Sequence, residues 1–463
     1  MIFSENKGGS HMTEQKEFIL NADLGMIRGI ETEEVRIFLG VPFAKAGRFE
    51  YASAIDRFDG VLNATAVGSG CPQNRAVHSH LEHPTRRFYW KEYREHSTFT
   101  YDENCLNVNI YTPKNAVNCP VVVYFYGGGF DSGLNAEEPF DGTGLAKRGV
   151  IAVIANYRVG PFGYFTHEAI FERFGRDGNF GLDDQRTAVK WVKAHIGDFG
   201  GDPENITLLG QSAGAISIQY LVLDPDNQGL FQHAAMMSGA GKFPKFGSPK
   251  RAEETREYWK EFMGYAGCKT FEEIRNAGPD RIFDAMEKIR SVRKDNIYNT
   301  MPVVDGKLLK KPVHELIGTP LPVDYMIGYT NNDMYAPALA FIGNRFGKAN
   351  GAYVYYFDLD APGDGNRAFH SADVRYVFET LGRSWRPYGG RDFEAAGQMA
   401  SYLANFARTG DPNSEGLPEW KPIRRGFGKK VLHIGPDRTE MGNVNYLKLT
   451  ANFLKIGDPK AES

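Results

Sequence analysis

Short apolar segments alternate with amphipathic ones along most of this chain, and that alternation constrains its fold more than any other feature. Residues 121–126 are apolar without polar alternation, which is typical of a strand buried on both faces. Similar short runs follow at 150–155, 206–209, 234–237, 325–328, 353–357 and 431–433. Helices are expected at 183–195, where Ala188, Trp191 and Val192 share one face, and at 213–222. The pattern predicts an α/β protein whose central sheet is mostly parallel and flanked by helices on both faces.

Composition excludes several classes of protein. The chain has 463 residues, 42% of them hydrophobic and 24% charged, so it is neither disordered nor fibrous. Its formal net charge is −3, which leaves no basic excess for nucleic acid or an anionic membrane surface. No apolar run approaches the roughly 18 residues of a membrane span. We therefore expect no nucleic-acid or membrane partner. The charged stretch 251–293 predicts surface helices beside the sheet.

The two ends of the chain differ from its middle. Gly8-Gly9-Ser10-His11-Met12 resembles a linker and a cloning junction, so residues 1–11 are interpreted as an expression tag. We expect one domain over residues 12–455 and a flexible tail over 456–463. The residues after Met12 are too polar for a secretory signal, which favours a cytoplasmic protein, with secretion as the alternative. Four cysteines without metal-site spacing suit buried thiols, and we expect no metal or cofactor.

The motif Gly210-Gln211-Ser212-Ala213-Gly214 matches G-x-S-x-G. Alone it is weak, but here it follows an apolar strand and opens a helix, which is the context that a nucleophile on a tight strand-to-helix turn requires. The glycines avoid clashes in the turn, and the helix N-terminus favours a developing negative charge beside the serine. Ser212 is therefore the candidate nucleophile. The alternative is a glycine–serine turn without chemistry.

A second glycine cluster, Gly127-Gly128-Gly129, ends the buried strand at 121–126. Such a loop lets backbone N–H groups converge on one oxygen, so we predict that Gly128, Gly129 and Ala213 form an oxyanion hole. A phosphate loop would need a following lysine and serine or threonine, which Phe130-Asp131-Ser132 does not supply. A flexible turn remains the alternative.

Chain order narrows the choice of base and acid, because triads on such sheets run from serine to acid to histidine. After Ser212 the histidines are His233, His314, His370 and His433. His370 lies in a loop after the strand at 353–357, where a base would hang over the nucleophile. For the acid, Asp333 follows the strand at 325–328, whereas the competitors Asp324 and Asp305 do not.

Together these motifs resemble the type-B carboxylesterase family, the cholinesterase-like branch of the α/β-hydrolase fold, including its bacterial para-nitrobenzyl-esterase-like members. The similarity extends from about residue 18 to residue 448. The matching segments are Gly40–Ala44, Glu103–Asn109, Tyr126–Phe130, Asn156–Gly160, Gly178–Gln185, Phe199–Pro203, Gly210–Gly214, Phe369–Phe378, Phe406–Asn413 and Trp420.

The resemblance implies a triad of Ser212, Asp333 and His370, and a serine esterase that cleaves carboxylic esters through an acyl-enzyme. Expected substrates are small-molecule esters of broad range, including bulky aryl or carbohydrate-linked ones such as feruloyl or acetyl esters. A carbamate or amide hydrolase, a catalytically silent binding protein and, more remotely, a lyase are the alternatives. We expect a monomer or a small homo-oligomer. Phe130 and Gln211 are candidate pocket residues, with core packing as the alternative for Phe130.

The resemblance also implies structural roles. Arg48 with Glu103, and Arg158 with Asp184, occupy positions of family salt bridges. Cys71 and Cys105 match a pair that forms a disulfide in secreted members, and whether they do so here stays open.

Three departures from the family pattern affect the site. The family's usual acid is glutamate, whereas Asp333 is one methylene shorter, and Met334 follows where glycine is usual. Gln211 replaces a glutamate often found before the nucleophile. The interval from Asp333 to His370 is short compared with that of fuller members, so we expect a reduced wall or lid and a shallower, more open site.

Overall fold

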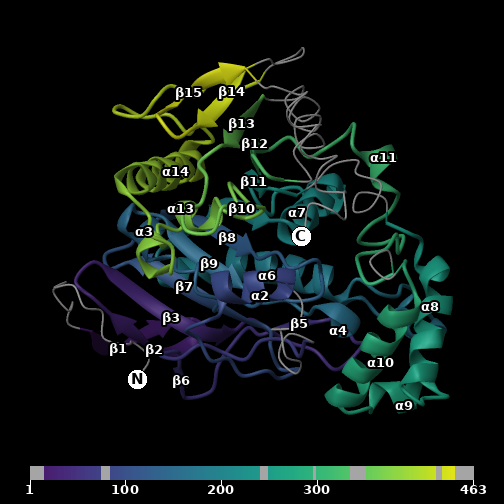
Figure 1. Cartoon of the computed structure of the whole chain (residues 1–463). Helices are drawn as coiled ribbons and strands as arrows, with labels where there is room; N and C mark the ends of the chain where they lie inside the picture. Colours follow the sequence, from purple (N-terminus) through teal and green to yellow (C-terminus); the bar gives the residue numbers. More distant parts are fainter. Residues whose placement is uncertain are drawn as a thin grey trace.

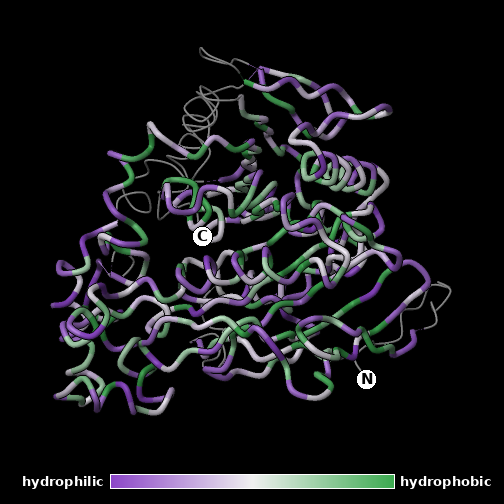
Figure 2. The backbone as a smooth tube through the Cα atoms, turned by 180° about the vertical axis from the view of Figure 1, so that it is seen from behind, coloured by the Kyte–Doolittle hydropathy of each residue, from purple (hydrophilic) through white to green (hydrophobic). Residues whose placement is uncertain are grey.

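The computed structural model describes residues 15–73, 84–239, 249–295, 299–333, 351–423 and 430–443. The predicted tag at 1–11 and tail at 456–463 lie outside these residues, and both stay predictions. The buried apolar residues from Leu24 to Ile434 form a single hydrophobic cluster. In Figure 2 the hydrophobic colour gathers along the strands in the middle of the molecule.

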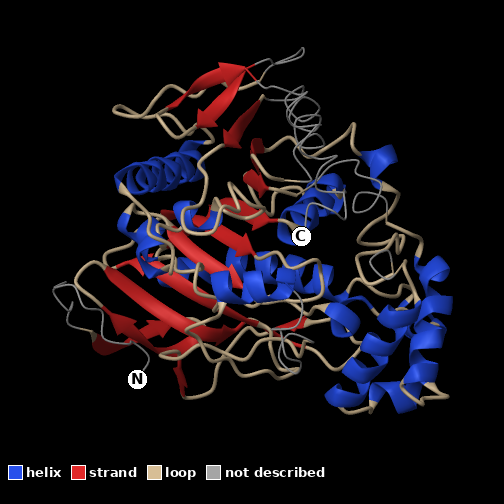
Figure 3. Ribbon diagram, viewed as in Figure 1, coloured by secondary structure: helices blue, strands red, loops and turns tan. Residues whose placement is uncertain are grey.

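A 13-stranded sheet forms the centre of the molecule (Figures 1 and 3). Its order is β1-β2-β3-β7-β9-β8-β10-β11-β12-β13-β14-β15, with β6 paired to β2. The strands are β1 Lys16–Ala22, β2 Gly25–Glu31, β3 Val35–Pro42, β6 Val61–Asn63, β7 Asn107–Pro113, β8 Cys119–Phe125, β9 Ile151–Ala155, β10 Gly201–Gln211, β11 His233–Met237, β12 Asp324–Thr330, β13 Ala352–Phe357, β14 Lys430–Ile434 and β15 Thr439–Asn443. A separate small sheet pairs β4 Ala44–Lys45 with β5 Ser53–Ala54.

The strands from β9 through β8 and β10 to β14 are all parallel, as the sequence predicts. The two flanks differ, because β1, β2, β3 and β7 pair antiparallel, as do β14 and β15. The apolar runs of the sequence indicate β14, through the run at 431–433, but none of β1, β2, β3, β7 and β15. In β1 and β2 exposed and less exposed residues alternate, so these strands lack the continuous apolar run that marks a central strand.

Helices lie on both sides of the sheet (Figure 3). They are α2 Pro84–Tyr93, α3 Thr143–Lys147, α4 Gly160–Tyr164, α5 Glu168–Phe174, α6 Phe180–His195, α7 Ala213–Leu223, α8 Ala252–Tyr265, α9 Phe271–Arg275, α10 Pro279–Val292, α11 Val313–Leu316, α13 Val374–Val377 and α14 Gly390–Thr409. α14 packs on α3, α13 and the strands β8 and β10, while α7 packs on β10 and β11. The predicted helices at 183–195 and 213–222 correspond to α6 and α7.

The charged stretch at 251–293 does form helices, and α8 to α10 stand beside the sheet in Figure 1. They are more than surface helices, because Tyr258, Trp259 and Phe262 of α8 are buried. The Trp259 and Phe262 rings contact Phe165. In the part of the chain that the structure describes, no helix combines the length and the apolar character that a membrane crossing requires.

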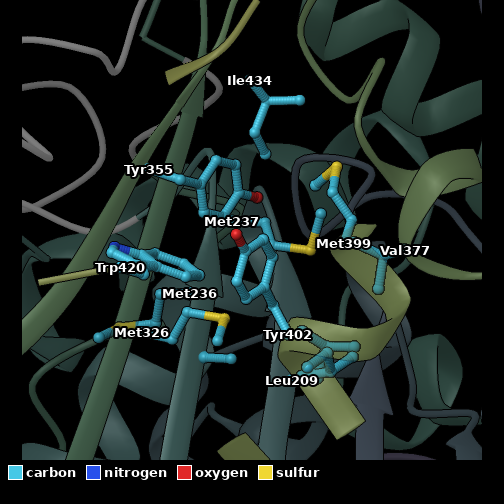
Figure 4. Close-up of a pocket in the computed structure, with 12 residues that line it drawn as sticks. Leu209, Met236, Met237, Met326, Tyr355, Val377, Met399, Tyr402, Trp420 and Ile434 are labelled. Atoms are coloured by element: carbon cyan, nitrogen blue, oxygen red, sulfur yellow. The ribbon is translucent and has the colours of Figure 1, made fainter. Parts of the chain in front are cut away.

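A small apolar cavity lies between the sheet and the helices α13 and α14 (Figure 4). Four methionine side chains and the rings of Tyr355, Tyr402 and Trp420 converge on it. The cavity is therefore part of the core behind the carboxyl end of the sheet rather than a polar binding pocket.

Candidate active site

The turn between β10 and α7 presents Ser212 at the carboxyl edge of the sheet. Ser212 has φ 54° and ψ −119°, a positive φ that is costly for a residue with a Cβ. The turn is held by the Ser212 N–H, which donates to the Met237 carbonyl at 2.9 Å. A Cβ on Gly210 would lie 2.6 Å from the Gly214 carbonyl carbon, and one on Gly214 would lie 2.0 Å from the Phe125 oxygen. The motif glycines are therefore sterically required, and the serine side chain stays partly exposed.

The glycine loop after β8 lies directly against Ser212. A Cβ on Gly127 would lie 2.8 Å from the Ser212 Cβ. Gly128 and Gly129 have φ of +110° and +65°, conformations that favour glycine. Among the described residues, the N–H groups of Gly128 and Gly129 donate to no protein acceptor. Ala213 begins α7, so its N–H has no acceptor within that helix. The loop that carries Gly128 and Gly129 thus packs against Ser212 at Gly127, and Ala213 follows the serine directly; the oxyanion hole formed by their N–H groups stays a prediction.

His370 and Asp333 complete a hydrogen-bonded chain with the serine. His370 Nε2 lies 2.9 Å from Ser212 Oγ, and His370 Nδ1 lies 3.1 Å from Asp333 Oδ1. The loops carrying them meet because Asn332 and Phe369 form a parallel bridge, in which the Asn332 N–H donates to the Ala368 carbonyl. The shorter aspartate therefore reaches the imidazole because the two loops are paired backbone to backbone.

Burial and charge act in opposite directions on His370. The Asp333 side chain is fully buried, whereas that of His370 is 20% exposed. Burial by itself lowers the pKa of His370, but the Asp333 charge and hydrogen bond, together with Asp373, raise it above its ordinary value. The site thus favours an imidazole that accepts a proton from Ser212.

The two candidate pocket residues are both buried. Gln211 turns its amide toward the base, with its Nε2 at 3.3 Å from His370 Nε2. Phe130 is only 1% exposed, and its ring packs edge-on against Tyr164. Phe130 therefore packs in the core, as its alternative role predicts. A substrate-contacting role for either residue stays a prediction.

The rejected competitors lie elsewhere. Asp324 starts β12 and faces His233 at the start of β11, with Oδ2 and Nδ1 2.9 Å apart. This second His–Asp pair sits at the amino end of the parallel strands, away from Ser212. Asp305 caps a turn by accepting the N–H groups of Lys307, Leu308 and Leu309.

Sequence reasoning missed three residues in or against the segment that carries the base. The Tyr89 hydroxyl of α2 donates to the His370 carbonyl at 3.1 Å. Asp373 is fully buried, and Tyr355 donates to its Oδ2 at 2.6 Å. A pattern that could have indicated Asp373 is a lone carboxylate three residues after the histidine in a segment rich in apolar residues. Nothing in the sequence marks Tyr89 or Tyr355.

The expected structural pairs are formed. Arg48 Nε donates to Glu103 Oε2 at 2.9 Å, and Arg158 makes a bidentate pair with Asp184 at 2.8 and 2.7 Å. Cys71 and Cys105 are both buried and both free thiols. They interact, because a hydrogen bond with Cys71, followed by burial, raises the pKa of Cys105. Residues 334–350, which include Met334 and bear on the expected openness of the site, lie outside the described residues.

Known proteins resemble this chain over most of its length. The para-nitrobenzyl esterase of Bacillus subtilis (strain 168) is 33% identical over 329 residues, which cover 68% of this chain and 63% of that esterase. The cholinesterase of Mus musculus is 31% identical over 365 residues, covering 75% of this chain and 58% of that enzyme. Both alignments thus span less than two thirds of the relative. Carboxylesterase 5A of Canis lupus familiaris is 28% identical over 491 residues, with 86% and 82% covered.

Solved structures agree with the sequence relatives. A PNB esterase structure has a TM-score of 0.78 and 25% identity, covering 94% of this chain and 99% of that one. A thermophilic PNB esterase has a TM-score of 0.77 and 26% identity. The sheet order and the position of the serine turn therefore belong to an α/β-hydrolase fold. The sequence profile of the carboxylesterase family matches residues 16–342 and 334–453, so the chain belongs to the carboxylesterase family.

Proposed function

We propose that this protein hydrolyses carboxylic esters through an acyl-enzyme formed on Ser212. The observation that carries the proposal is the hydrogen-bonded chain from Ser212 Oγ through His370 to Asp333, at 2.9 and 3.1 Å. A hydroxyl becomes a useful nucleophile when a neighbouring base accepts its proton and a third group orients that base. Membership of the carboxylesterase family supports the same reaction.

In the first half-reaction His370 Nε2 takes the proton of Ser212 Oγ while that oxygen attacks the ester carbonyl carbon. Asp333 keeps the imidazole in the tautomer with its proton on Nδ1 and stabilises the imidazolium that forms. The carbonyl oxygen becomes an oxyanion, which the N–H groups of Gly128, Gly129 and Ala213 stabilise. His370 then protonates the leaving alcohol, and the acyl group remains on Ser212.

In the second half-reaction a water molecule replaces the alcohol. His370 takes a proton from that water, which attacks the acyl carbon and passes through a second oxyanion in the same N–H cluster. Collapse of this intermediate breaks the bond to Ser212 Oγ. The serine recovers its proton from His370, and the carboxylic acid leaves.

For the substrate class we propose esters with a bulky aryl or carbohydrate-linked part. The para-nitrobenzyl esterase relative is named for an ester whose alcohol part carries an aromatic ring. A comparison of p-nitrophenyl acetate, butyrate and octanoate would measure how long an acyl chain the site accepts. Feruloyl esters and acetyl esters of sugars would test the bulky aryl and carbohydrate-linked substrates. A rate confined to p-nitrophenyl acetate would contradict this substrate class. We also propose a cytoplasmic location, which the free thiols of Cys71 and Cys105 support.

The first test is labelling with a fluorophosphonate probe and measurement of ester turnover. We expect one label per chain, lost in Ser212→Ala together with about 10⁴-fold or more of kcat. Ser217→Ala is a matched control, because this buried serine lies in α7, the helix that Ser212 precedes, and donates to the Ala213 carbonyl at 3.0 Å. Retained labelling in Ser212→Ala would overturn the assignment of the nucleophile.

A second aspartate of this chain provides a control for the proposed role of Asp333. Asp333→Asn is expected to lower kcat by about 10⁴, because the neutral amide no longer imposes the tautomer that His370 needs. Asp324→Asn removes a carboxylate from the other His–Asp pair, at the opposite end of the strands, and should leave kcat unchanged. Equal losses in both variants would mean that the two aspartates act only through stability.

Two outcomes would replace the proposal. Faster turnover of a matched amide or carbamate than of the ester would make the protein an amide or carbamate hydrolase at the same site. Absence of both labelling and turnover with an intact Ser212 would favour a silent binding protein. In that case the site would bind carbonyl compounds without forming the acyl-enzyme.

A further inference from the structure

A second buried carboxylate lies beside the base. Asp373 follows His370 by three residues, is fully buried, and precedes the short helix α13, where its carbonyl accepts the N–H groups of Tyr376 and Val377 at 3.2 and 3.1 Å. Within the described residues its Oδ1 has no hydrogen-bond partner. A carboxylate this deeply buried is costly unless another group stabilises it. The burial of the Asp373 carboxylate therefore needs an explanation.

Tyr355 of β13 holds the other oxygen of this carboxylate. Its hydroxyl donates to Asp373 Oδ2 at 2.6 Å, and its ring lies over Gly328, the residue paired with it on β12. A Cβ on Gly328 would lie 1.8 Å from the Tyr355 Cζ, so only glycine leaves room for the ring. The ring also lines the cavity of Figure 4. The tyrosine is thus packed in one orientation with its hydroxyl on Asp373.

We propose that Asp373, held by Tyr355, is a positioning residue that stabilises the protonated form of His370 during ester hydrolysis. The inference rests on the proposed function, because it assigns a role to a neighbour of the proposed base. Asp373 does not transfer a proton itself. The proton of Ser212 Oγ still goes to His370 Nε2 and from there to the leaving alcohol, while Asp373 remains an anion.

Few charged groups of the described residues act on His370 and Asp373. Asp333, in the loop after β12, acts on both His370 and Asp373. From α2, Tyr93 interacts with Ser371, and Tyr89 with the His370 carbonyl. Arg375, from the same segment as Asp373, lies instead 3.7 Å from Glu138. Among the described residues, the anions that raise the pKa of His370 are therefore Asp333 and Asp373.

Three tyrosines of this region stay neutral over the pH range of the kinetic tests. Burial raises the pKa of Tyr93, of Tyr124 on β8 and of Tyr355. These tyrosines therefore contribute no charge between pH 5 and 8. Burial, opposed by the Tyr355 hydrogen bond, raises the pKa of Asp373 to about 6. Asp373 is therefore an anion at neutral pH and is neutralised just below it.

The sign of the effect follows from the charge. An anion near the imidazole raises its pKa, and the pKa of His370 is raised, with Asp373 among the causes. The base works when it is neutral, so kcat/KM rises with pH through that pKa. Removing the Asp373 charge should lower the pKa of His370 and destabilise the imidazolium of the transition state.

Asp373→Asn tests this directly. We expect the acid limb of the kcat/KM profile to move down by about half a unit to one unit, and kcat at pH 8 to fall about tenfold. KM should change little, because the buried side chain does not touch substrate. An acid limb that stays in place, or a loss of kcat that is equal at every pH, would overturn the proposal.

Tyr355→Phe gives an independent readout with a different pH dependence. Without the hydroxyl, the pKa of Asp373 should rise further, so the carboxylate stays neutral up to higher pH. Activity should then fall several-fold below pH 7 and return toward the wild-type value at pH 8. Tyr356→Phe is the matched control, because this neighbouring phenol bonds to Asp358 at 3.3 Å and should leave the profile unchanged. Identical profiles for the two phenylalanine variants would contradict the role of Tyr355.

The design separates this inference from the proposed function. If the wild-type protein takes no fluorophosphonate label and cleaves no ester, the proposed function itself is contradicted. If the wild-type protein is active and Asp373→Asn has the same acid limb in its kcat/KM profile, only the role proposed for Asp373 is contradicted. Circular dichroism of each variant identifies one that fails to fold, and Tyr355→Phe then carries the test alone.

Discussion

At the scale of single residues, two donors compete for one nitrogen of the base. Ser212 Oγ lies 2.9 Å and Gln211 Nε2 lies 3.3 Å from His370 Nε2. A neutral imidazole whose Nδ1–H faces Asp333 has one lone pair at Nε2, which the hydroxyl and the amide share. An amide N–H beside that atom also disfavours the imidazolium. Gln211 is thus in a position to oppose the carboxylates that favour the charged ring.

The substitution Gln211→Glu should reverse this effect. A carboxylate beside Nε2 raises the pKa of His370, so the acid limb of the kcat/KM profile should move up by about one unit. The loss should be largest at pH 6 and small at pH 8. Gln228→Glu adds the same charge at an exposed position and should leave the limb unchanged, because solvent screens it. A shift to lower pH in Gln211→Glu would show that the amide does not oppose the imidazolium.

At the scale of elements, ion pairs, a ring contact and a hydrogen bond join helix α2 to the loop that carries His370 and to the residues around it. Arg386, whose side chain is fully buried, contacts Glu92 of α2 at 2.9 Å and Asp364 at 2.7 Å. The Phe88 ring of α2 packs edge-on against Phe369, the residue before His370. Together with the hydrogen bond from Tyr89, these contacts mean that α2 positions the histidine loop from one side.

We therefore expect Glu92→Gln to affect both stability and catalysis. Neutralising one partner of a buried ion pair should lower the free energy of unfolding by about 3 kcal/mol, moderated because Arg386 keeps Asp364. We also expect kcat to fall several-fold as the loop of His370 loosens. Urea unfolding and steady-state kinetics measure the two effects. Glu272→Gln breaks an exposed pair with Arg275 and should change neither. A stable Glu92→Gln protein would show that α2 is held in another way.

At the scale of the whole molecule, one hydrophobic core joins the antiparallel flank, the parallel centre and the covering helices. Cys71 and Cys105 are buried in that core, whereas Cys119 is partly exposed. A thiol within a cooperative core reacts only when the fold opens. The cysteines therefore report on how far the molecule unfolds as one unit.

In native protein, iodoacetamide should modify Cys119 first. Cys71 and Cys105 should react at least about 10³-fold more slowly, as expected for opening that requires most of the unfolding free energy. Peptide mass spectrometry over time measures the rates, with protein in denaturant as the control in which all sites react. Fast labelling of Cys71 would indicate local opening of its segment. A pair that reacts only after reduction would show a disulfide instead of the free thiols.

The sequence by itself determined the features that depend on neighbours along the chain. Continuous apolar runs indicated the parallel strands, and the glycines around Ser212 indicated a tight turn, because both patterns reflect burial and sterics within a few residues. The antiparallel strands β1 and β2 could not be predicted in this way, since their half-exposed residues lack such runs, and in the buried strand β7 polar residues interrupt the apolar run.

Only the tertiary structure decided which groups meet. Asp333 faces His370 because the bridge between Asn332 and Phe369 pairs their loops, while parallel strand register brings Asp324 to His233 at the other end. Tyr89 reaches the base from a helix far away in the sequence, and Asp373 gains its partner because Gly328 admits the Tyr355 ring. These contacts depend on strand register and packing between distant segments, and local residue patterns carry no information about either.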